Sequence, residues 1–124
     1  MADLGELDYC YVTTAGRVTG APHRIEIWFA LHDETLYLLS GAGGRSDWVR
    51  NLLDAPDVVV ELGDRRRTTV ARPVEAGTEE DALARRLLFD KYATRGHADL
   101  VEWAASALPI AIEWPAATTY TSLL

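Results

Sequence analysis

The sequence has one cysteine, Cys10, and no long run of apolar residues. A single cysteine cannot form an internal disulfide, so a disulfide framework is excluded. Apolar runs such as 58–60 fall far short of the roughly 20 residues that a membrane-spanning helix needs. No basic segment followed by an apolar stretch opens the chain, so we expect no signal peptide and a cytoplasmic location.

Basic residues are also scarce, because 12 lysines and arginines stand against 19 aspartates and glutamates, a formal net charge of −7 at pH 7. Such a charge does not favour nucleic-acid binding. In residues 1–62 the basic residues are confined to two glycine-rich segments, which contain Arg17, Arg24, Arg45 and Arg50. Positive charge beside glycine-rich backbone is suited to a small anionic ligand, although solvated surface arginines would give the same pattern.

The length of 124 residues predicts a single domain, 1–124, with a core of its own. Alternating or β-branched patterns predict strands at 9–14, 23–31, 35–40, 58–62, 68–74 and 109–114. Helical spacing predicts helices from Ser46 or Asp47 to Pro56, at 79–95 and at 97–107. Hairpin turns are expected at 33–34 and 63–64, with Arg65–Arg67 solvated at the second tip. Strands joined by hairpins, without regular helical crossovers, predict a small antiparallel barrel.

The first glycine-rich segment, 16–24, joins two predicted strands. Its glycines can turn backbone N–H groups toward an anion, Thr19 adds a hydroxyl, and arginines offer bidentate contacts to phosphate. It lacks the ending of a P-loop and the glycine spacing of a dinucleotide fingerprint. An ordinary hairpin loop is the alternative interpretation.

The second segment, 40–52, runs from a strand through a glycine-rich loop into the start of a helix. Unpaired N–H groups and the helix dipole make such a place favourable for an anion. Trp48, Arg50 and Asn51 near the first turn are suited to holding a flat ring and its polar edges. Packing of Trp48 in the core is the alternative.

The usual catalytic sets are missing from the sequence. His23, His32, His97 and Cys10 lack metal-ligand spacing, so we expect no metal site. No nucleophile elbow, Cys–His signature or zinc-protease helix occurs, and Cys10 is expected to pack as a small core residue. A cofactor is therefore expected to carry the chemistry.

The segments 13–23 (TTAGRVTGAPH), 40–44 (SGAGG) and 48–52 (WVRNL) together resemble the deazaflavin (F420)-dependent nitroreductase family of the split β-barrel flavin-binding superfamily. The motifs cover about residues 9–62, and the element order to residue 114 is compatible. The resemblance implies a mainly β (α+β) fold, a split antiparallel β-barrel of about six strands with two to three peripheral helices. It implies coenzyme F420 as the cofactor, with FMN as the alternative.

The resemblance also implies which residues form the site. The tail of the coenzyme is expected near Arg17, Thr19, Gly20, Pro22 and His23, with its ring beside Glu26 and Trp28. Ser40 and the loop with Gly41, Gly43 and Gly44 would wrap the ring edge or the phosphate, and Trp48 and Asn51 would close the pocket. The substrate rim would comprise Tyr92, His97, Leu100 and Trp103, with His97 and Tyr92 as candidate proton donors.

The chain departs from the family at positions that often bind the tail. Val18 and His23 stand where the family often has basic residues, and the glycine loop lacks a lysine. Arg24, Arg45 and Arg50 are the expected replacements. The function implied is hydride transfer from reduced F420 to an electron-poor quinone, enone or nitro compound. An FMN-binding oxidoreductase of the same fold and a non-catalytic flavin- or lipid-binding protein are the alternatives, and a homodimer is compatible with the resemblance.

Overall fold

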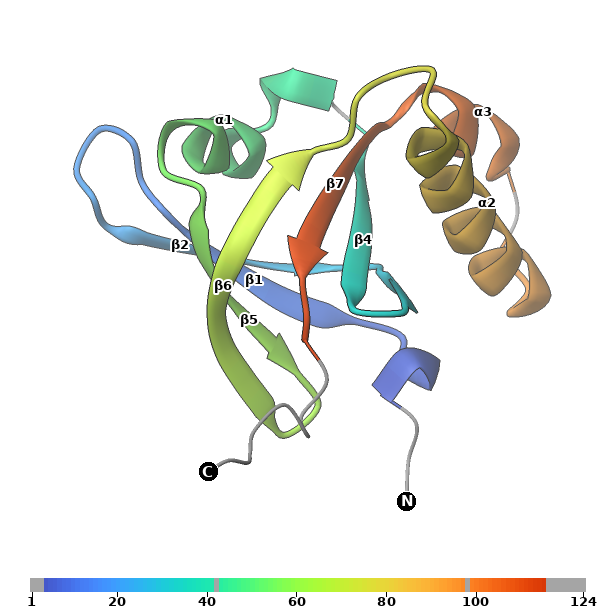
Figure 1. The fold of residues 1–124 in the computed structure, drawn as a ribbon, viewed down its shortest axis with the longest axis horizontal. Coiled ribbons are helices and arrows are strands. Elements are labelled where there is room, and N and C mark those ends of the chain that lie inside the picture. Colours follow the sequence, from blue (N-terminus) through green and yellow to red (C-terminus); the bar gives the residue numbers. More distant parts are fainter. Residues whose placement is uncertain (1–3, 42, 98, 116–124) are drawn as a thin grey trace.

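The computed structural model describes residues 4–41, 43–97 and 99–115. Within these ranges the strands are β1 (Cys10–Ala15), β2 (Pro22–Ile27), β3 (Ala30–His32), β4 (Thr35–Ser40), β5 (Asp57–Leu62), β6 (Arg65–Pro73) and β7 (Leu108–Glu113). The α-helices are α1 (Asp47–Asp54), α2 (Glu79–Thr94) and α3 (Val101–Ser106), and the 3-10 helices are η1 (Leu4–Glu6) and η2 (Gly43–Arg45). Figure 1 shows the strands curling around an interior, with α1 on one side and α2 and α3 on the other.

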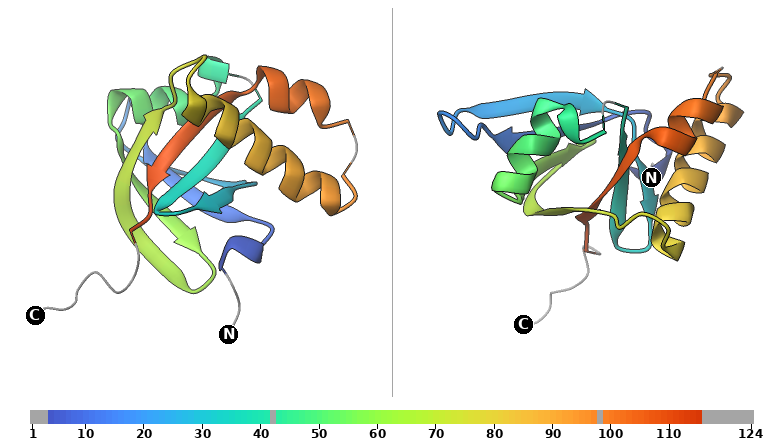
Figure 2. Two further views of the ribbon diagram at one scale, coloured as in Figure 1. Left: turned by 45° about the vertical axis from the view of Figure 1, so that its right-hand side comes forward. Right: turned by 90° about the horizontal axis from the view of Figure 1, so that it is seen from above.

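The strands form one seven-stranded antiparallel sheet in the order β2-β1-β5-β6-β7-β4-β3. β6 bends this sheet, because residues 65–70 pair with β5 whereas residues 71–73 pair with β7. The sheet therefore folds back on itself as an open half-barrel (Figure 2). This arrangement confirms the predicted split antiparallel barrel, with seven strands where about six were expected.

Two apolar cores lie on opposite faces of β4. The barrel interior contains Cys10, Val12, Leu36, Leu38, Val49, Leu52, Val60, Ile110 and Ile112, among others. The second core lies between the sheet and the helices α2 and α3 and includes Tyr37, Leu39, Leu88, Tyr92 and Leu100. Successive residues of β4 alternate between the two cores, which explains its uninterrupted apolar sequence 36–39. Cys10 is fully buried, as predicted.

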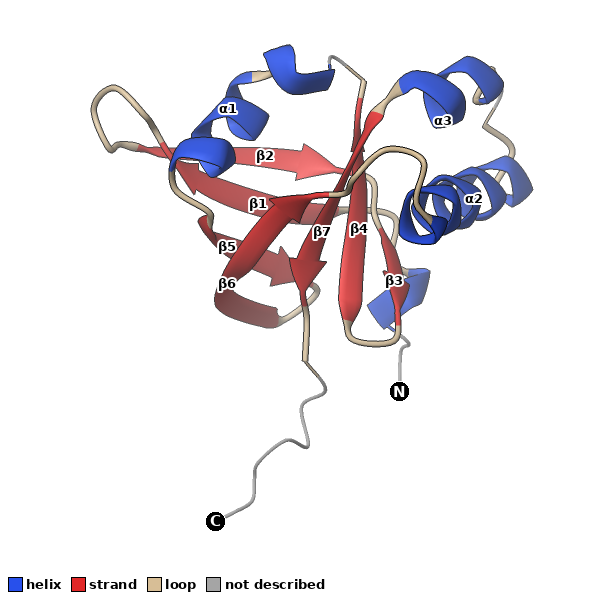
Figure 3. Ribbon diagram, turned by 45° about the horizontal axis from the view of Figure 1, so that its top comes forward, coloured by secondary structure: helices blue, strands red, loops and turns tan. Residues whose placement is uncertain are grey.

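α2 contacts the sheet through Ala84, Leu88 and Tyr92, which are spaced four residues apart and are each fully buried. The hydroxyl of Thr78 accepts a hydrogen bond from the backbone N–H of Asp81 at 3.1 Å and so caps the helix. Figure 3 shows α2 and α3 beside the β3–β4 part of the sheet, with α1 over the end where β2 begins. The helix predicted at 79–95 is therefore confirmed and packs outside the barrel.

The strand predicted over 23–31 is in fact two strands, β2 and β3, separated at Trp28 and Phe29. The backbone N–H of Phe29 donates to the hydroxyl of Tyr92 at 3.0 Å, and its carbonyl accepts from Nζ of Lys91 at 2.9 Å. Side chains of α2 thus take the place of a strand partner at Phe29, and the chain turns there.

Two smaller expectations also need correction. Arg65–Arg67 begin β6 and do not form the hairpin tip, because the two-residue turn at 63–64 brings Arg65 directly into register with Leu62. The helix expected at 97–107 begins only at Val101. Ala42 of the predicted glycine loop and Ala98 of that predicted helix lie outside the described residues. In the part of the chain that the structure describes, the helices are too short or too polar to cross a membrane.

Candidate functional site

Two surface pockets lie at opposite ends of β2. The loop pocket, of about 320 Å³, is lined by Gly16, Arg17, Val18, Thr19, Ala21, Pro22, His23, Asp47 and Asn51. The aromatic pocket, of about 300 Å³, is lined by Tyr9, Glu26, Ile27, Trp28, Leu39, Leu100 and Trp103. Because a strand rises about 3.3 Å per residue, the three residues from His23 to Glu26 place the two pockets roughly 10 Å apart along β2.

The β1–β2 loop has a fixed shape. The N–H of Gly16 donates to the carbonyl of Ala21 at 2.8 Å, and the N–H of Gly20 donates to the carbonyl of Gly16 at 2.7 Å. A Cβ at position 16 would lie 2.9 Å from the carbonyl oxygen of Ala21, which requires glycine there. Gly20 has φ of +77°, a conformation that also favours glycine. The glycines therefore shape the loop pocket.

Asn51 of α1 joins the helix to this loop. Its side-chain oxygen accepts from the backbone N–H of Arg17 at 3.2 Å and from the Arg17 guanidinium at 2.9 Å. Its amide nitrogen donates to the hydroxyl of Thr14 at 3.1 Å. Asn51 is only 3% exposed, so these bonds form largely away from water. Arg17 and Asn51, two predicted site residues from separate glycine-rich segments, are thus in direct contact.

Charges of both signs surround the loop pocket. The guanidinium of Arg17 lies 3.3 Å from the carboxylate of Asp47, and this ion pair fixes one positive group at the pocket. His23 and Arg50 are exposed, and within the described residues neither side chain has a hydrogen-bonding or ion-pair partner. His23 lines the loop pocket and is thereby left for an anionic ligand, whereas Arg50 lies on α1 and lines neither pocket.

Trp28 is the centre of an aromatic cluster at the other end of β2. Its ring stacks on Tyr92 with centroids 4.1 Å apart and planes within 6°. His97 lies 4.4 Å away at 53°, and Trp103 meets it edge-on at 5.5 Å. Such offset and edge-to-face contacts hold aromatic rings in defined positions. The aromatic pocket therefore has a preformed flat wall.

Tyr92 supports this wall from beneath and does not face the pocket. It is fully buried, and its hydroxyl donates to the carbonyl of Asp8 at 2.8 Å. Burial raises the pKa of Tyr92 to about 12. A buried hydroxyl that already has donor and acceptor partners is poorly placed to give up a proton, which argues against Tyr92 as a rim residue and proton donor.

The connection from β4 to α1 runs between the two pockets. At its start, Leu39 lines the aromatic pocket, and a Cβ at Gly41 would lie 3.8 Å from the Trp103 ring. The hydroxyls of Ser40 and Ser46 lie 2.8 Å apart, and the Ser40 hydroxyl donates to the carbonyl of Gly43 at 2.9 Å. Gly43 and Gly44 face open space. Ser40, Gly41, Gly43 and Gly44 line neither pocket, so the role expected of this loop stays a prediction.

The structure separates several predicted site residues from the pockets. Arg24 donates to the carboxylate of Glu61 at 2.8 Å and lies 3.9 Å from the centre of the Tyr11 ring. This hydrogen bond lowers the pKa of Glu61. Trp48 is 8% exposed and packs in the barrel core, which is the alternative that the sequence left open. Arg45 is exposed in η2 and does not line either pocket.

Outside the loop at 16–24, sequence reasoning missed four lining residues: Tyr9, Ile27, Leu39 and Asp47. Tyr9 precedes β1, and its position at the pocket depends on contacts between residues 6–8 and α2. Leu39 looked like an ordinary strand residue. Asp47 is the i−4 neighbour of Asn51, and that helical spacing was the available indication that the two share a face.

The chain matches proteins of known family and fold. A sequence model of the family described as F420H(2)-dependent quinone reductase matches residues 2–115. Among solved structures, an F420-H2-dependent reductase has 20% identity and a TM-score of 0.68, over 86% of this chain and 93% of that one. A conserved hypothetical protein from Mycobacterium tuberculosis has 18% identity and a TM-score of 0.70, over 98% and 87%. A structure described as a domain-swapped dimer has 20% identity and a TM-score of 0.67, over 86% and 79%.

No curated protein matches the chain significantly. Within the described ranges, no three histidine, cysteine, aspartate or glutamate side chains gather as metal ligands do.

Proposed function

Because the chain belongs to the F420H(2)-dependent quinone reductase family, we propose that the loop pocket, the aromatic pocket and the connection between them form one elongated site for coenzyme F420. Family membership makes F420 the cofactor and F420-dependent reduction of a small molecule the reaction. The flat ring system of the coenzyme belongs in the aromatic pocket. Its phosphate-bearing tail belongs at the loop pocket.

The main support for this proposal is that the surroundings change from apolar and aromatic at one end of β2 to polar and basic at the other. At one end, Trp28, Leu39 and Trp103 offer flat and apolar surfaces suited to a deazaflavin ring. At the other end, Arg17, Thr19 and His23 surround a polar pocket. An elongated ligand with a flat head and an anionic tail matches both ends and a separation of roughly 10 Å between them.

The residues present fit such a coenzyme. The Arg17 guanidinium is fixed by Asp47 and Asn51, so it is oriented before the ligand arrives. His23 at the loop pocket offers a further hydrogen-bonding group, and the exposed Arg50 on the neighbouring helix α1 adds positive charge. Gly43 and Gly44 leave room for close approach to the backbone, since a Cβ at either position would meet nothing within 4 Å.

When bound, the reduced coenzyme supplies the hydride for the reaction. The protein's residues orient the ring against Trp28, exclude water with Leu100 and Trp103, and position the acceptor at the open side of the pocket. We assign the proton donor to His97, because its ring lies 4.4 Å from Trp28 and is exposed to solvent. Electron-poor acceptors are the matching class, namely quinones, enones and nitro compounds.

The test is a titration of the purified protein with F420 and, separately, with FMN, following the fluorescence of each. We expect saturable binding of F420 and oxidation of F420H2 by a quinone such as menadione. In His97→Ala, we expect the rate to fall and its pH dependence to change. Binding of FMN in preference to F420, or F420 binding without turnover on any quinone, enone or nitro compound, would overturn the proposal.

We also propose that the chain is a single domain and that the protein is cytoplasmic. We further propose that two copies form a homodimer. β2 is an edge strand whose residues 22–24 are exposed, so a second copy has a surface to cover. A relative is described as a domain-swapped dimer, which supports the proposal. Light scattering after size-exclusion chromatography measures the mass in solution. We expect twice the mass of the 13.7 kDa chain, and the mass of one chain would contradict the dimer.

A further inference from the structure

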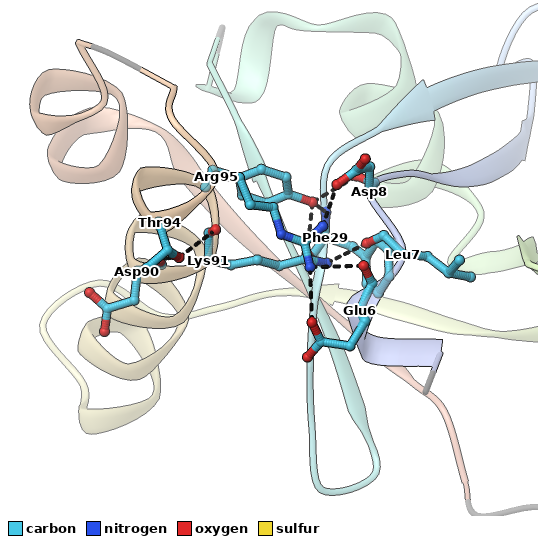
Figure 4. Close-up of polar contacts among 9 residues, drawn as sticks. Glu6, Leu7, Asp8, Phe29, Asp90, Lys91, Thr94 and Arg95 are labelled. Atoms are coloured by element: carbon cyan, nitrogen blue, oxygen red, sulfur yellow. Dashed lines mark hydrogen bonds and ion pairs between the residues drawn. The ribbon is translucent and has the colours of Figure 1, made fainter. Parts of the chain in front are cut away.

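The segment before β1 is held by the last turn of α2 and by Arg95, the residue that follows this helix. Nζ of Lys91 donates to the carbonyl of Leu7 at 2.7 Å, and the hydroxyl of Tyr92 donates to the carbonyl of Asp8 at 2.8 Å. The guanidinium of Arg95 donates to the carbonyl of Glu6 at 2.8 Å. Three consecutive backbone carbonyls are therefore bound by side chains from the C-terminal end of α2 and the residue after it (Figure 4).

Ion pairs strengthen this attachment. Arg95 also pairs with the carboxylates of Glu6, at 3.3 Å, and Asp8. Nζ of Lys91 donates a second hydrogen bond to the carbonyl of Phe29 at 2.9 Å and lies 3.7 Å from the centre of the Phe29 ring. The segment 6–8 and the break between β2 and β3 are consequently fixed to the same residues of α2.

The next residue after this segment is Tyr9, which lines the aromatic pocket together with Trp28 and Trp103. Its side chain is 48% exposed, so it is not needed to fill the core. Tyr92 links the two features, since its hydroxyl holds Asp8 while its ring stacks beneath Trp28. The placement of Tyr9 relative to the flat wall of the pocket thus depends on the contacts from α2.

We propose that Tyr9 is a specificity-determining residue that stacks with flat aromatic acceptors at the open side of the aromatic pocket, and that Lys91 and Arg95 are positioning residues that hold it there. This inference rests on the proposed function, because the acceptor must enter the aromatic pocket. An exposed phenol ring favours a flat electron-poor ring, such as a bicyclic quinone, over a small non-aromatic enone.

The kinetic test compares menadione with cyclohex-2-enone as acceptors. In Tyr9→Ala, we expect the ratio of kcat/KM for menadione to kcat/KM for cyclohex-2-enone to fall about three- to tenfold, through KM. Tyr9→Phe keeps the ring and should restore the ratio to within about twofold. Arg95→Gln should lower the ratio in the same direction. Arg86→Gln is the matched control, because Arg86 is exposed on the same helix and shows no side-chain partner in the described chain.

Hydrogen exchange provides a readout without turnover. We expect the amides of residues 5–9 to exchange faster in Lys91→Met and Arg95→Gln than in the wild type, and to be unchanged in Arg86→Gln. An unchanged acceptor ratio in Tyr9→Ala, with F420 binding intact, would overturn the inference alone. Failure of the wild type to bind F420 would overturn the proposed function as well, so the two failures are distinguishable.

Discussion

Asn51 binds Arg17 through both the backbone and the side chain of the arginine. One buried amide oxygen accepts the Arg17 N–H at 3.2 Å and the guanidinium at 2.9 Å, while the amide nitrogen donates to Thr14. This arrangement connects α1 to the β1 side of the β1–β2 turn, at Thr14 and Arg17. The shape of the loop pocket therefore depends on a residue of the helix as much as on the glycines of the loop.

Replacing Asn51 by alanine removes three hydrogen bonds at a site that is 3% exposed. At about 1 kcal/mol for each bond, we expect the free energy of unfolding to fall by about 2–3 kcal/mol. Guanidinium unfolding followed by tryptophan fluorescence measures this loss. F420 affinity of the folded Asn51→Ala protein should fall too, because Arg17 loses its orientation. A variant as stable as the wild type would show that these bonds contribute nothing.

Arg24 and Arg50 provide a matched pair of charge removals. Arg24 is paired with Glu61 and lies over Tyr11, whereas Arg50 is exposed on α1 next to Asn51. We expect Arg50→Gln to weaken F420 binding about tenfold, the effect of one charge-assisted contact, and to reduce the salt dependence of binding. Arg24→Gln should change affinity less than about twofold. The opposite order would place the tail of the coenzyme on the outer face of the sheet.

The two tryptophans Trp28 and Trp48 have different roles, which substitution separates. Trp48 is 8% exposed in the barrel core, so Trp48→Ala should cost about 3–5 kcal/mol of unfolding free energy. Trp48→Phe should retain F420 affinity. Trp28→Phe should weaken F420 binding while costing less stability, because Trp28 is only half-buried. Fluorescence titration and thermal unfolding of each variant are the measurements. If Trp48→Phe folds stably but loses affinity for F420, then Trp48 contacts the coenzyme and is not only a core residue.

Sequence patterns predicted most strands and helices well, because these elements are determined by residues close to one another in the sequence. The alternation of Ile25 and Ile27 with polar neighbours and the turn at 63–64 depend on residues close in sequence. The break after Ile27 is different, since its cause is Tyr92 and Lys91, more than 60 residues away.

The same distinction holds for the site. The glycine-rich loops were recognisable from sequence because their backbone chemistry is local. Arg24 and Glu61 are 37 residues apart in the sequence, yet their side chains pair. This pairing occupies an arginine that the sequence suggested as a ligand for the coenzyme tail. The position of Tyr9 depends on contacts with α2 about 85 residues later. Only the three-dimensional arrangement shows such partners.

Lys91 gives the stability of the protein a pH dependence of predictable sign. Burial, with a smaller contribution from Arg95, lowers the pKa of Lys91 from 10.5 to about 8, against the opposing charges of Asp8, Cys10 and Glu6. Below pH 8 the lysine is charged in the folded and the unfolded chain. Between about pH 8 and 10.5 the unfolded chain keeps a proton that the folded chain releases, so Lys91 makes folding more favourable as pH rises.

Cys10 and Tyr92 act in the opposite direction at higher pH. Burial raises both pKa values to about 12, so the stability that their protonated forms contribute is lost as pH rises from 9 or 10 toward 12. Lys91→Met isolates the lysine, because it keeps the aliphatic stem and leaves the other two groups in place. We expect the stability of the wild type relative to Lys91→Met to increase from pH 7.5 to 10, as measured by urea unfolding. A constant difference across this range would mean that Lys91 keeps an ordinary pKa, and its two carbonyl contacts would then outweigh its burial.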